Sequence, residues 1–140
     1  LEAMSAYCCS ESVTDDQKEF VNKLCSSFGK VMPLSESYFP LFCSIAGCAP
    51  AYAYMFIDSL ARSAVKNGMN KSVALEIAAQ TVLGSAKKIL ESDEHPWELI
   101  DKVCSPGGTT IEGIVSLQKD GFESAVCNAV DAALQKDKKV

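Results

Sequence analysis

The sequence predicts an all-α fold: a multi-helix bundle that spans residues 1–140 as one domain and forms an intertwined homodimer. Residues that start and stop helices recur along the chain, whereas alternating strand patterns are scarce. The chain is 48% hydrophobic, which is enough for the core of one ordinary domain. One predicted helix is also apolar on every side, and this pattern favours a dimer.

The first predicted helix begins at a capping box. Thr14 and Gln17 have the spacing at which each side chain can cap the backbone amide of the other residue. An apolar stripe follows on one face of the helix, formed by Phe20, Val21, Leu24, Cys25 and Phe28. Gly29 is expected to end this helix, and residues 31–33 to form a short extended link. Ser35 is then expected to cap a second, short helix.

Residues 50–67 are predicted to form a central helix after a break at residues 46–47. Pro50 fits the first turn of a helix, and Gly68 fits its end. Residues 51–57 are apolar all the way round, so a soluble helix of this kind must be buried on all sides. Because so short a chain can hardly supply that cover, we infer an obligate dimer with interlocked helices. A central helix in a monomeric bundle is the alternative.

The rest of the chain is predicted to be helical as well. Asn70 is expected to cap the next helix, and Gly121 is expected to separate the last two helices. The predicted helices cover residues 71–92, 96–103, 109–119 and from 122 to at least 134.

Charge and hydropathy exclude several classes of partner. The net charge is −5 and no basic stripe is present, so nucleic acid is not expected as a partner. The cationic tail, formed by Lys136, Lys138 and Lys139, is interpreted as a solvated end. The longest apolar run, residues 48–57, is interrupted by Pro50 and is short of the roughly 18 residues that a bilayer needs. We therefore expect no membrane span, and a cytoplasmic location.

The seven cysteines are Cys8, Cys9, Cys25, Cys43, Cys48, Cys104 and Cys127. They contain no CxxC pair, and the single histidine, His95, lies far from most of them, so no metal site is predicted. An odd number of cysteines also argues against a secreted disulfide framework. The simplest interpretation is reduced, mostly buried thiols in a cytoplasmic protein. A redox pair formed by Cys8 and Cys9 is the alternative.

The segment Ser-Pro-Gly-Gly-Thr-Thr at residues 105–110 is the main candidate site. Two adjacent glycines, Gly107 and Gly108, allow successive N–H groups to point to one side and form an anion-binding nest. The helix that follows adds its own unpaired N–H groups. Three hydroxyl groups flank the glycines, those of Ser105, Thr109 and Thr110. The loop is thus suited to a carboxylate or a phosphate. A plain turn between helices, with threonine as the N-cap, is the alternative.

Other side chains with possible chemistry are assigned structural roles. His95 is expected to cap a helix or lie on the surface, Tyr52 and Tyr54 to pack, and Trp97 to anchor a core or an interface. The chain contains no GxGxxG fingerprint, no P-loop and no GxSxG elbow. No residue of this chain is therefore predicted to bind a cofactor.

The same loop carries a resemblance to a known family. Residues 103–114, Val-Cys-Ser-Pro-Gly-Gly-Thr-Thr-Ile-Glu-Gly-Ile, resemble the signature of the pyrroline-5-carboxylate reductases. Further segments resemble the family at matching separations: Met4-Ser5-Ala6, Ala49-Pro50-Ala51-Tyr52, the run at 79–84, Glu94-His95-Pro96, Leu117 and Gly121-Phe122.

The resemblance implies a two-domain oxidoreductase of proline biosynthesis. In this family an N-terminal Rossmann domain binds NAD(P)H, and a helical C-terminal domain forms an intertwined dimer that can assemble further into rings. The implied reaction is hydride transfer from NAD(P)H to 1-pyrroline-5-carboxylate, which gives L-proline. The active site would lie between the nucleotide domain of one subunit and the helical domain of its dimer mate.

The resemblance also implies roles for the loop residues. The implied substrate-binding residues are Ser105, Gly107, Gly108, Thr109 and Thr110, which would hold the substrate carboxylate. Thr110 would also be the catalytic residue, with a hydrogen bond near the ring nitrogen. The chain corresponds to the C-terminal domain alone, so we expect a shortened form of a longer enzyme that is inactive without the nucleotide domain.

Two departures from the family leave other functions open. Ala46-Gly47-Cys48-Ala49 stands where the family usually has Ser-Gly-Ser-Gly, and Lys102 stands where many members have asparagine. Lys102 could alter the electrostatics of the site or point to solvent. The alternatives are a divergent reductase of another cyclic imine and a non-catalytic helical dimerisation scaffold.

Overall fold

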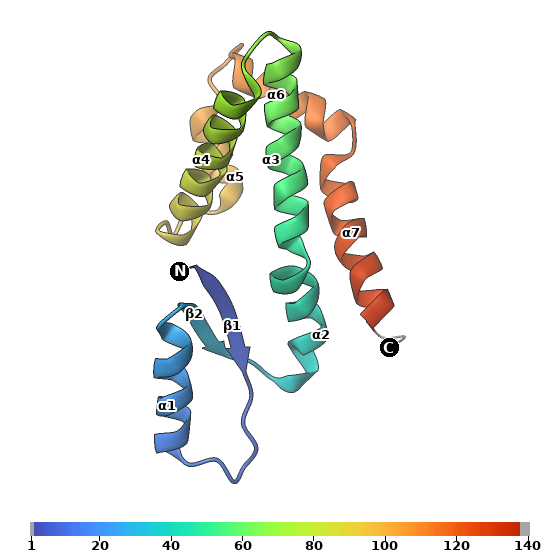
Figure 1. Cartoon of the computed structure of the whole chain (residues 1–140). Helices are drawn as coiled ribbons and strands as arrows, with labels where there is room; N and C mark the ends of the chain where they lie inside the picture. The colour runs from blue at the N-terminus through green and yellow to red at the C-terminus, as the bar shows by residue number, and fades with distance from the viewer. Residues whose placement is uncertain (1, 138–140) are drawn as a thin grey trace. The chain divides into compact units, whose positions relative to one another are not determined.

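The computed structural model describes residues 2–137 and is mostly helical, as predicted (Figure 1). Lys138 and Lys139 of the cationic tail lie outside the described residues. The elements are β1 (Ala3–Tyr7), α1 (Asp15–Ser26), β2 (Gly29–Pro33), the 3-10 turn η1 (Glu36–Tyr38), α2 (Phe39–Phe42), the π-helical η2 (Cys43–Gly47), α3 (Ala49–Lys66), α4 (Lys71–Leu90), α5 (Pro96–Val103), α6 (Thr109–Lys119) and α7 (Phe122–Asp137). They form two compact units, one of residues up to 50 with those from 130 onward, and one of residues 51–129.

The first unit contains a βαβ arrangement that the sequence analysis did not predict. Strands β1 and β2 pair in parallel, from Ala3 opposite Gly29 to Tyr7 opposite Pro33. Parallel strands need a crossover connection, and α1 provides it (Figure 1). Gly29 therefore begins a strand rather than ending the preceding helix, which stops at Ser26. The extended link predicted at residues 31–33 is part of β2.

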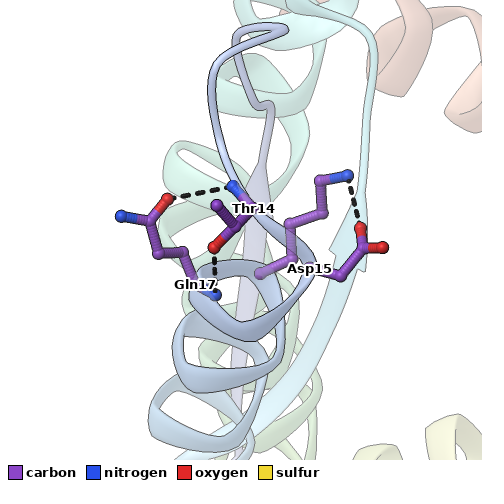
Figure 2. Close-up of polar contacts among 4 residues, drawn as sticks. Thr14, Asp15 and Gln17 are labelled. Atoms are coloured by element: carbon purple, nitrogen blue, oxygen red, sulfur yellow. Dashed lines mark hydrogen bonds and ion pairs between the residues drawn. The ribbon is translucent and has the colours of Figure 1, made fainter.

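The predicted capping box at the start of α1 is confirmed (Figure 2). The backbone N–H of Gln17 donates to Thr14 Oγ1 at 3.4 Å, and the N–H of Thr14 donates to Gln17 Oε1 at 3.0 Å. Each bond satisfies an amide that the first turn of a helix leaves without a partner. Asp15 and Asp16 place negative charge at the same end, where the helix dipole is positive.

The break predicted at residues 46–47 is wrong, because these residues belong to the π-helical turn η2. The N–H of Cys48 donates to the carbonyl of Cys43 at 3.2 Å, which is the five-residue spacing of a π-helix. Pro50, which has no N–H to donate, follows inside the first turn of α3. A wide turn just before the proline thus keeps the segment helical where the sequence suggested an interruption.

This finding also corrects the membrane prediction. Residues Glu36–Lys66 form a helical segment of 31 residues with a stretch of mean hydropathy 1.4. Among the described residues it is the one segment long and apolar enough to cross a bilayer, by length and composition alone. The same composition occurs in helices that are buried inside soluble assemblies, so the segment is weak evidence for a membrane.

The core of the second unit lies between α3 and α4. Ala61 on α3 packs with Ala74 and Ala78 on α4, and these side chains are 1%, 2% and 6% exposed. Ile57 and Ala64 extend the cluster. Alanines allow two helices to approach closely, but they bury little apolar area. This contact orients α3 and α4, and it leaves most large apolar side chains without cover.

The start of α7 contacts α3 in the same unit. The rings of Phe56 and Phe122 lie 5.9 Å apart between centroids, a usual distance for a tilted aromatic pair. The Tyr52 hydroxyl donates to the carbonyl of Ala129 at 3.3 Å. At the other end of α3, Asn70 Oδ1 accepts from the N–H of Ser72 at 2.9 Å and caps α4, as predicted.

Large apolar side chains are exposed on nearly every element of the single chain. Tyr54 and Met55, inside the all-apolar stretch of α3, are each 70% exposed. The other apolar side chains that are more than half exposed are Phe20, Leu24, Tyr38, Ile45, Ile77, Leu83, Leu90, Val103 and Val115. Soluble monomers rarely expose large apolar patches, so side chains exposed in this number favour cover by another chain.

The cysteines are not buried as expected. All seven carry free thiols, in agreement with the prediction of reduced cysteines. However, Cys8, Cys9, Cys43 and Cys127 are exposed, and the other three are only half-buried. The preference of free cysteine for protein interiors was the basis of the prediction, and this chain has too small a core to bury them.

Candidate functional site

The loop at residues 105–108 is a tight β-turn. The N–H of Gly108 donates to the carbonyl of Ser105 at 3.0 Å. Pro106 occupies the second position of the turn, where its ring fixes a suitable φ. Gly107 occupies the third position with φ of 67°, the left-handed conformation that a type II turn requires there. The Pro-Gly pair therefore determines the path of the chain from α5 into α6.

The second glycine of the loop, Gly108, is needed for space. A Cβ atom at this position would lie 2.4 Å from Ser105 Oγ and 3.1 Å from the Ser105 carbonyl oxygen. Real Cβ atoms do not approach other atoms at the shorter of these distances. The absence of a side chain at Gly108 thus lets Ser105 fold close against the start of α6.

The first turn of α6 has no side-chain cap. Gly108 is the N-cap residue, and no side chain accepts a hydrogen bond from the first amides of the helix. Thr109 and Thr110 are the first two residues of the helix itself, so the threonine N-cap of the alternative prediction is wrong. The N-terminal N–H groups of a helix need partners, and together with the helix dipole they favour an anion.

The structure brings the predicted loop residues together in this one turn. The side chains of Ser105, Thr109 and Thr110 are exposed, and Gly108 is half-buried. Among residues 2–137, no side-chain hydrogen bond of the protein uses any of these three hydroxyl groups. The hydroxyls and the uncapped amides are therefore all available to a ligand.

Thr110 also lines a hollow of ≈ 540 Å³ between α4, α5 and α6. Its walls are mostly apolar, with Leu99 and Ile100 from α5 and Ile114 from α6. The α4 wall adds polar or small residues, namely Gln80, Thr81, Gly84, Ser85 and Lys88. Three of these residues, Gln80, Thr81 and Gly84, lie in the run that resembles the family, but the sequence did not mark the α4 group as part of a site. Its spacing places it on one helical face, and that spacing is the signal that could have identified it.

His95 has the structural role that was predicted for it. Its Nδ1 atom accepts a hydrogen bond from the N–H of Trp97 at 3.2 Å and caps α5. Trp97, the expected core or interface anchor, is 42% exposed in the single chain. Tyr52 packs against α7 through its bond to Ala129, whereas Tyr54 contributes nothing to the core of the chain.

Lys102 pairs with a residue outside the candidate turn. Its ammonium forms an ion pair with the carboxylate of Glu94, which precedes α5. The hydrogen bond from Lys102 lowers the pKa of Glu94, and the positive charge of Lys88 adds to the effect. Of the two possibilities left open by the sequence, the solvent-facing one fits the structure, since the Lys102 side chain is 65% exposed.

The described residues contain no group of three or more His, Cys, Asp or Glu side chains that could hold a metal ion. What the turn and the hollow offer is a place for a small anionic molecule. The anion would meet amides and hydroxyls at the start of α6, and its apolar part would face the hollow beside Thr110.

Comparison with known proteins matches most of the chain to one family. The family model described as pyrroline-5-carboxylate reductase dimerisation matches residues 36–140. The pyrroline-5-carboxylate reductase of Escherichia coli is 41% identical over 128 residues, which cover 91% of this chain and 48% of that enzyme. The soybean (Glycine max) enzyme is 37% identical over 139 residues, 99% of this chain and 51% of the relative. The chain thus spans about half the length of the curated relatives it matches.

A solved structure supports the same relationship. The 1-pyrroline-5-carboxylate reductase of Streptococcus pyogenes superposes with a TM-score of 0.90 at 42% identity, over 97% of this chain and 53% of that one. The pyrroline carboxylate reductase of Plasmodium falciparum, solved with NADP bound, gives a TM-score of 0.88 at 38% identity, over 96% and 55% of the two chains. This chain therefore belongs to the pyrroline-5-carboxylate reductase family.

Proposed function

We propose that this chain supplies the dimer interface and the substrate-carboxylate loop of a reductase that converts 1-pyrroline-5-carboxylate into L-proline. The observation that carries the proposal is the start of α6, an uncapped helix end that follows a type II turn. The names of the relatives give the substrate class, and the loop is a segment that resembles the family signature.

The carboxylate of the substrate would bind at this turn. The amides of α6 and the hydroxyls of Ser105 and Thr109 can donate to its oxygens, and the helix dipole favours its negative charge. Because Gly107 and Gly108 fix the turn before any ligand arrives, little ordering is needed on binding.

Thr110 would orient the reacting ring. Its side chain lines the hollow beside the turn, so a ring attached to the bound carboxylate would extend towards its hydroxyl. A hydrogen bond from Thr110 near the ring nitrogen would hold the carbon–nitrogen double bond in place for reduction. NAD(P)H, when bound, supplies the hydride, and this chain has no dinucleotide fingerprint of its own. We propose that a nucleotide-binding domain outside these 140 residues holds the cofactor.

The apolar surface would be covered by a second copy of the chain. The matching family is described as a dimerisation domain, and the most exposed apolar stretch is the helix predicted to interlock. Burial between two copies accounts for the hydropathy of residues 36–66 without a membrane. We further propose that the nucleotide domain of the mate completes the site, that dimers can assemble into rings, and that the protein is cytoplasmic, with no nucleic-acid partner.

The test is turnover by the full-length protein supplied with 1-pyrroline-5-carboxylate and NADH or NADPH. We expect cofactor oxidation with formation of one L-proline per cofactor consumed. If the folded, dimeric protein reduces another cyclic imine with a higher kcat/KM, the alternative function, a divergent reductase of that imine, replaces this proposal. If it reduces neither and still dimerises, the chain is a non-catalytic scaffold.

A further inference from the structure

Cys8 and Cys9 form an exposed pair at the end of β1, outside the proposed reductase site. Both thiols are free. They follow Tyr7, the last residue of the strand, in a segment without regular secondary structure. An adjacent pair of free, exposed thiols differs from a single one because the second thiol can attack a disulfide formed on the first.

The pair lines a hollow of ≈ 710 Å³ at the carboxyl ends of the two parallel strands. The residues after β2 form the opposite wall, with Leu34, Ser35 and Glu36. In parallel sheets, the carboxyl ends of the strands are where ligands commonly bind. Both cysteines, whose side chains are exposed, therefore border a space that a small molecule can enter.

Charged groups of both signs face this hollow. Lys18, from α1, provides an ammonium group, and Glu36 provides a carboxylate. The hydrogen bond from Lys18 to Asp15 raises the pKa of Lys18, and the negative charge of Asp15 adds to this effect. Cys9 and Tyr7 make smaller contributions in the same direction, so the ammonium remains charged. A molecule that carries both a carboxylate and an ammonium group would complement the two walls.

Cys9 is the thiol closer to this cation. Cys9 and Lys18 line a second hollow on the α1 side as well, of ≈ 470 Å³, which Cys8 does not line. Cys9 can therefore be approached from both hollows, and the thiol that attacks a small disulfide needs this access. The structure thus distinguishes an attacking thiol, Cys9, from a resolving thiol, Cys8.

We propose that Cys8 and Cys9 form a dithiol site that exchanges with small zwitterionic disulfides of the glutathione type. The Cys9 thiolate attacks one sulfur of the small disulfide, forms a mixed disulfide and releases a thiolate that takes up the proton lost by Cys9. The Cys8 thiolate then attacks the sulfur of Cys9, forms the Cys8–Cys9 bond and releases the second small thiol. The two cysteines lose two electrons and two protons, and the small disulfide gains both.

The test treats the reduced chain with glutathione disulfide and follows intact mass and peptide maps over time. The unmodified sequence is expected to lose two hydrogens at Cys8–Cys9. Cys8→Ser should trap glutathione on Cys9 as a stable adduct. Cys127→Ser, which removes an exposed thiol elsewhere, is the matched control and should behave like the unmodified sequence.

The role of the hollow is tested through charge. Lys18→Gln should slow the first step about threefold with glutathione disulfide, because it removes a charge that attracts the carboxylates of that disulfide. Lys23→Gln, on the same helix outside both hollows, should not slow it. Neutral hydroxyethyl disulfide should react more slowly than glutathione disulfide. A stable adduct on Cys9 despite the presence of Cys8, or equal reaction at all exposed cysteines, would overturn the proposal.

Discussion

Gly107 and Gly108 have different roles in the same turn, and the sequence analysis could anticipate only one of them. A glycine after proline is the usual signal of a type II turn, and the structure has that turn with φ of 67° at Gly107. The need for glycine at position 108 arises from a contact with Ser105, which a sequence cannot display. The anion-binding interpretation of the loop followed from residue types, whereas the α4 wall beside Thr110 required the fold.

The hydroxyl of Thr110 is predicted to contribute to the reaction and little to stability. Thr110→Ala in the full-length enzyme should remove roughly 1.5–3 kcal/mol of transition-state stabilisation, the contribution of a hydrogen bond to a charged group. This loss is measured as a fall in kcat/KM. Ser116→Ala, a hydroxyl deletion later in α6, is the control and should leave kcat/KM unchanged. An unchanged kcat/KM for Thr110→Ala would assign this residue to structure alone.

Gly108→Ala is predicted to disturb the turn itself. The new Cβ forces the Ser105 hydroxyl to rotate away and the Ser105 carbonyl to shift by a few tenths of an ångström, so we expect a loss of about 1 kcal/mol in the free energy of unfolding and a clear rise in KM. Gly113→Ala, inside α6 with no atom near its Cβ, is the control and should stabilise the protein by about 0.5–1 kcal/mol. Urea denaturation and steady-state kinetics measure both effects. Equal stability and KM for Gly108→Ala and the unmodified protein would remove the proposed steric role.

Helices were predictable at the scale of elements, and the two strands were not. Caps such as Thr14 and Asn70 act through neighbouring residues, so they are visible in the sequence and were confirmed. Strands β1 and β2 have five residues each and pair across the whole of α1, with too little alternation to stand out. The π-helical turn before Pro50 was missed for a related reason, because proline usually signals an interruption.

The ion pair that flanks α5 is predicted to make stability depend on pH. Lys102 lowers the pKa of Glu94 in the folded protein, so the pair stabilises above the ordinary pKa of glutamate. This stabilisation is lost as the pH falls through the lowered value. Urea midpoints should therefore differ slightly between Glu94→Gln and the unmodified chain at pH 7, and converge as the pH is lowered until the carboxyl is protonated. Glu76→Gln is the control, and a difference that persists at acid pH would contradict the assignment.

At the scale of the whole molecule, the described chain has an apolar surface much larger than its core. Its buried apolar side chains are the three alanines of α3 and α4, while Tyr54 and Met55 lie exposed. The prediction of an interlocked dimer followed from the all-apolar stretch of α3, and the exposed side chains support that proposal. The sequence could not define the partner surface, because it depends on how two copies are arranged.

A charge placed in this apolar surface is predicted to separate the two copies. Met55→Asp should weaken self-association at least about 100-fold, because burying an unpaired carboxylate has a large free-energy cost. Gln118→Glu adds the same charge at an exposed polar position of α6 and should leave association unchanged. Circular dichroism would establish that both variants keep their helices. Equal association of Met55→Asp and the unmodified chain would place the interface elsewhere.

The interface and the shared active site both depend on the claim that two copies form one folded unit. Sedimentation equilibrium of the 140-residue chain at micromolar concentration measures this directly. The account predicts a stable dimer, with twice the chain mass of 15.0 kDa. A folded monomer that stays at 15.0 kDa as the concentration is raised would contradict it.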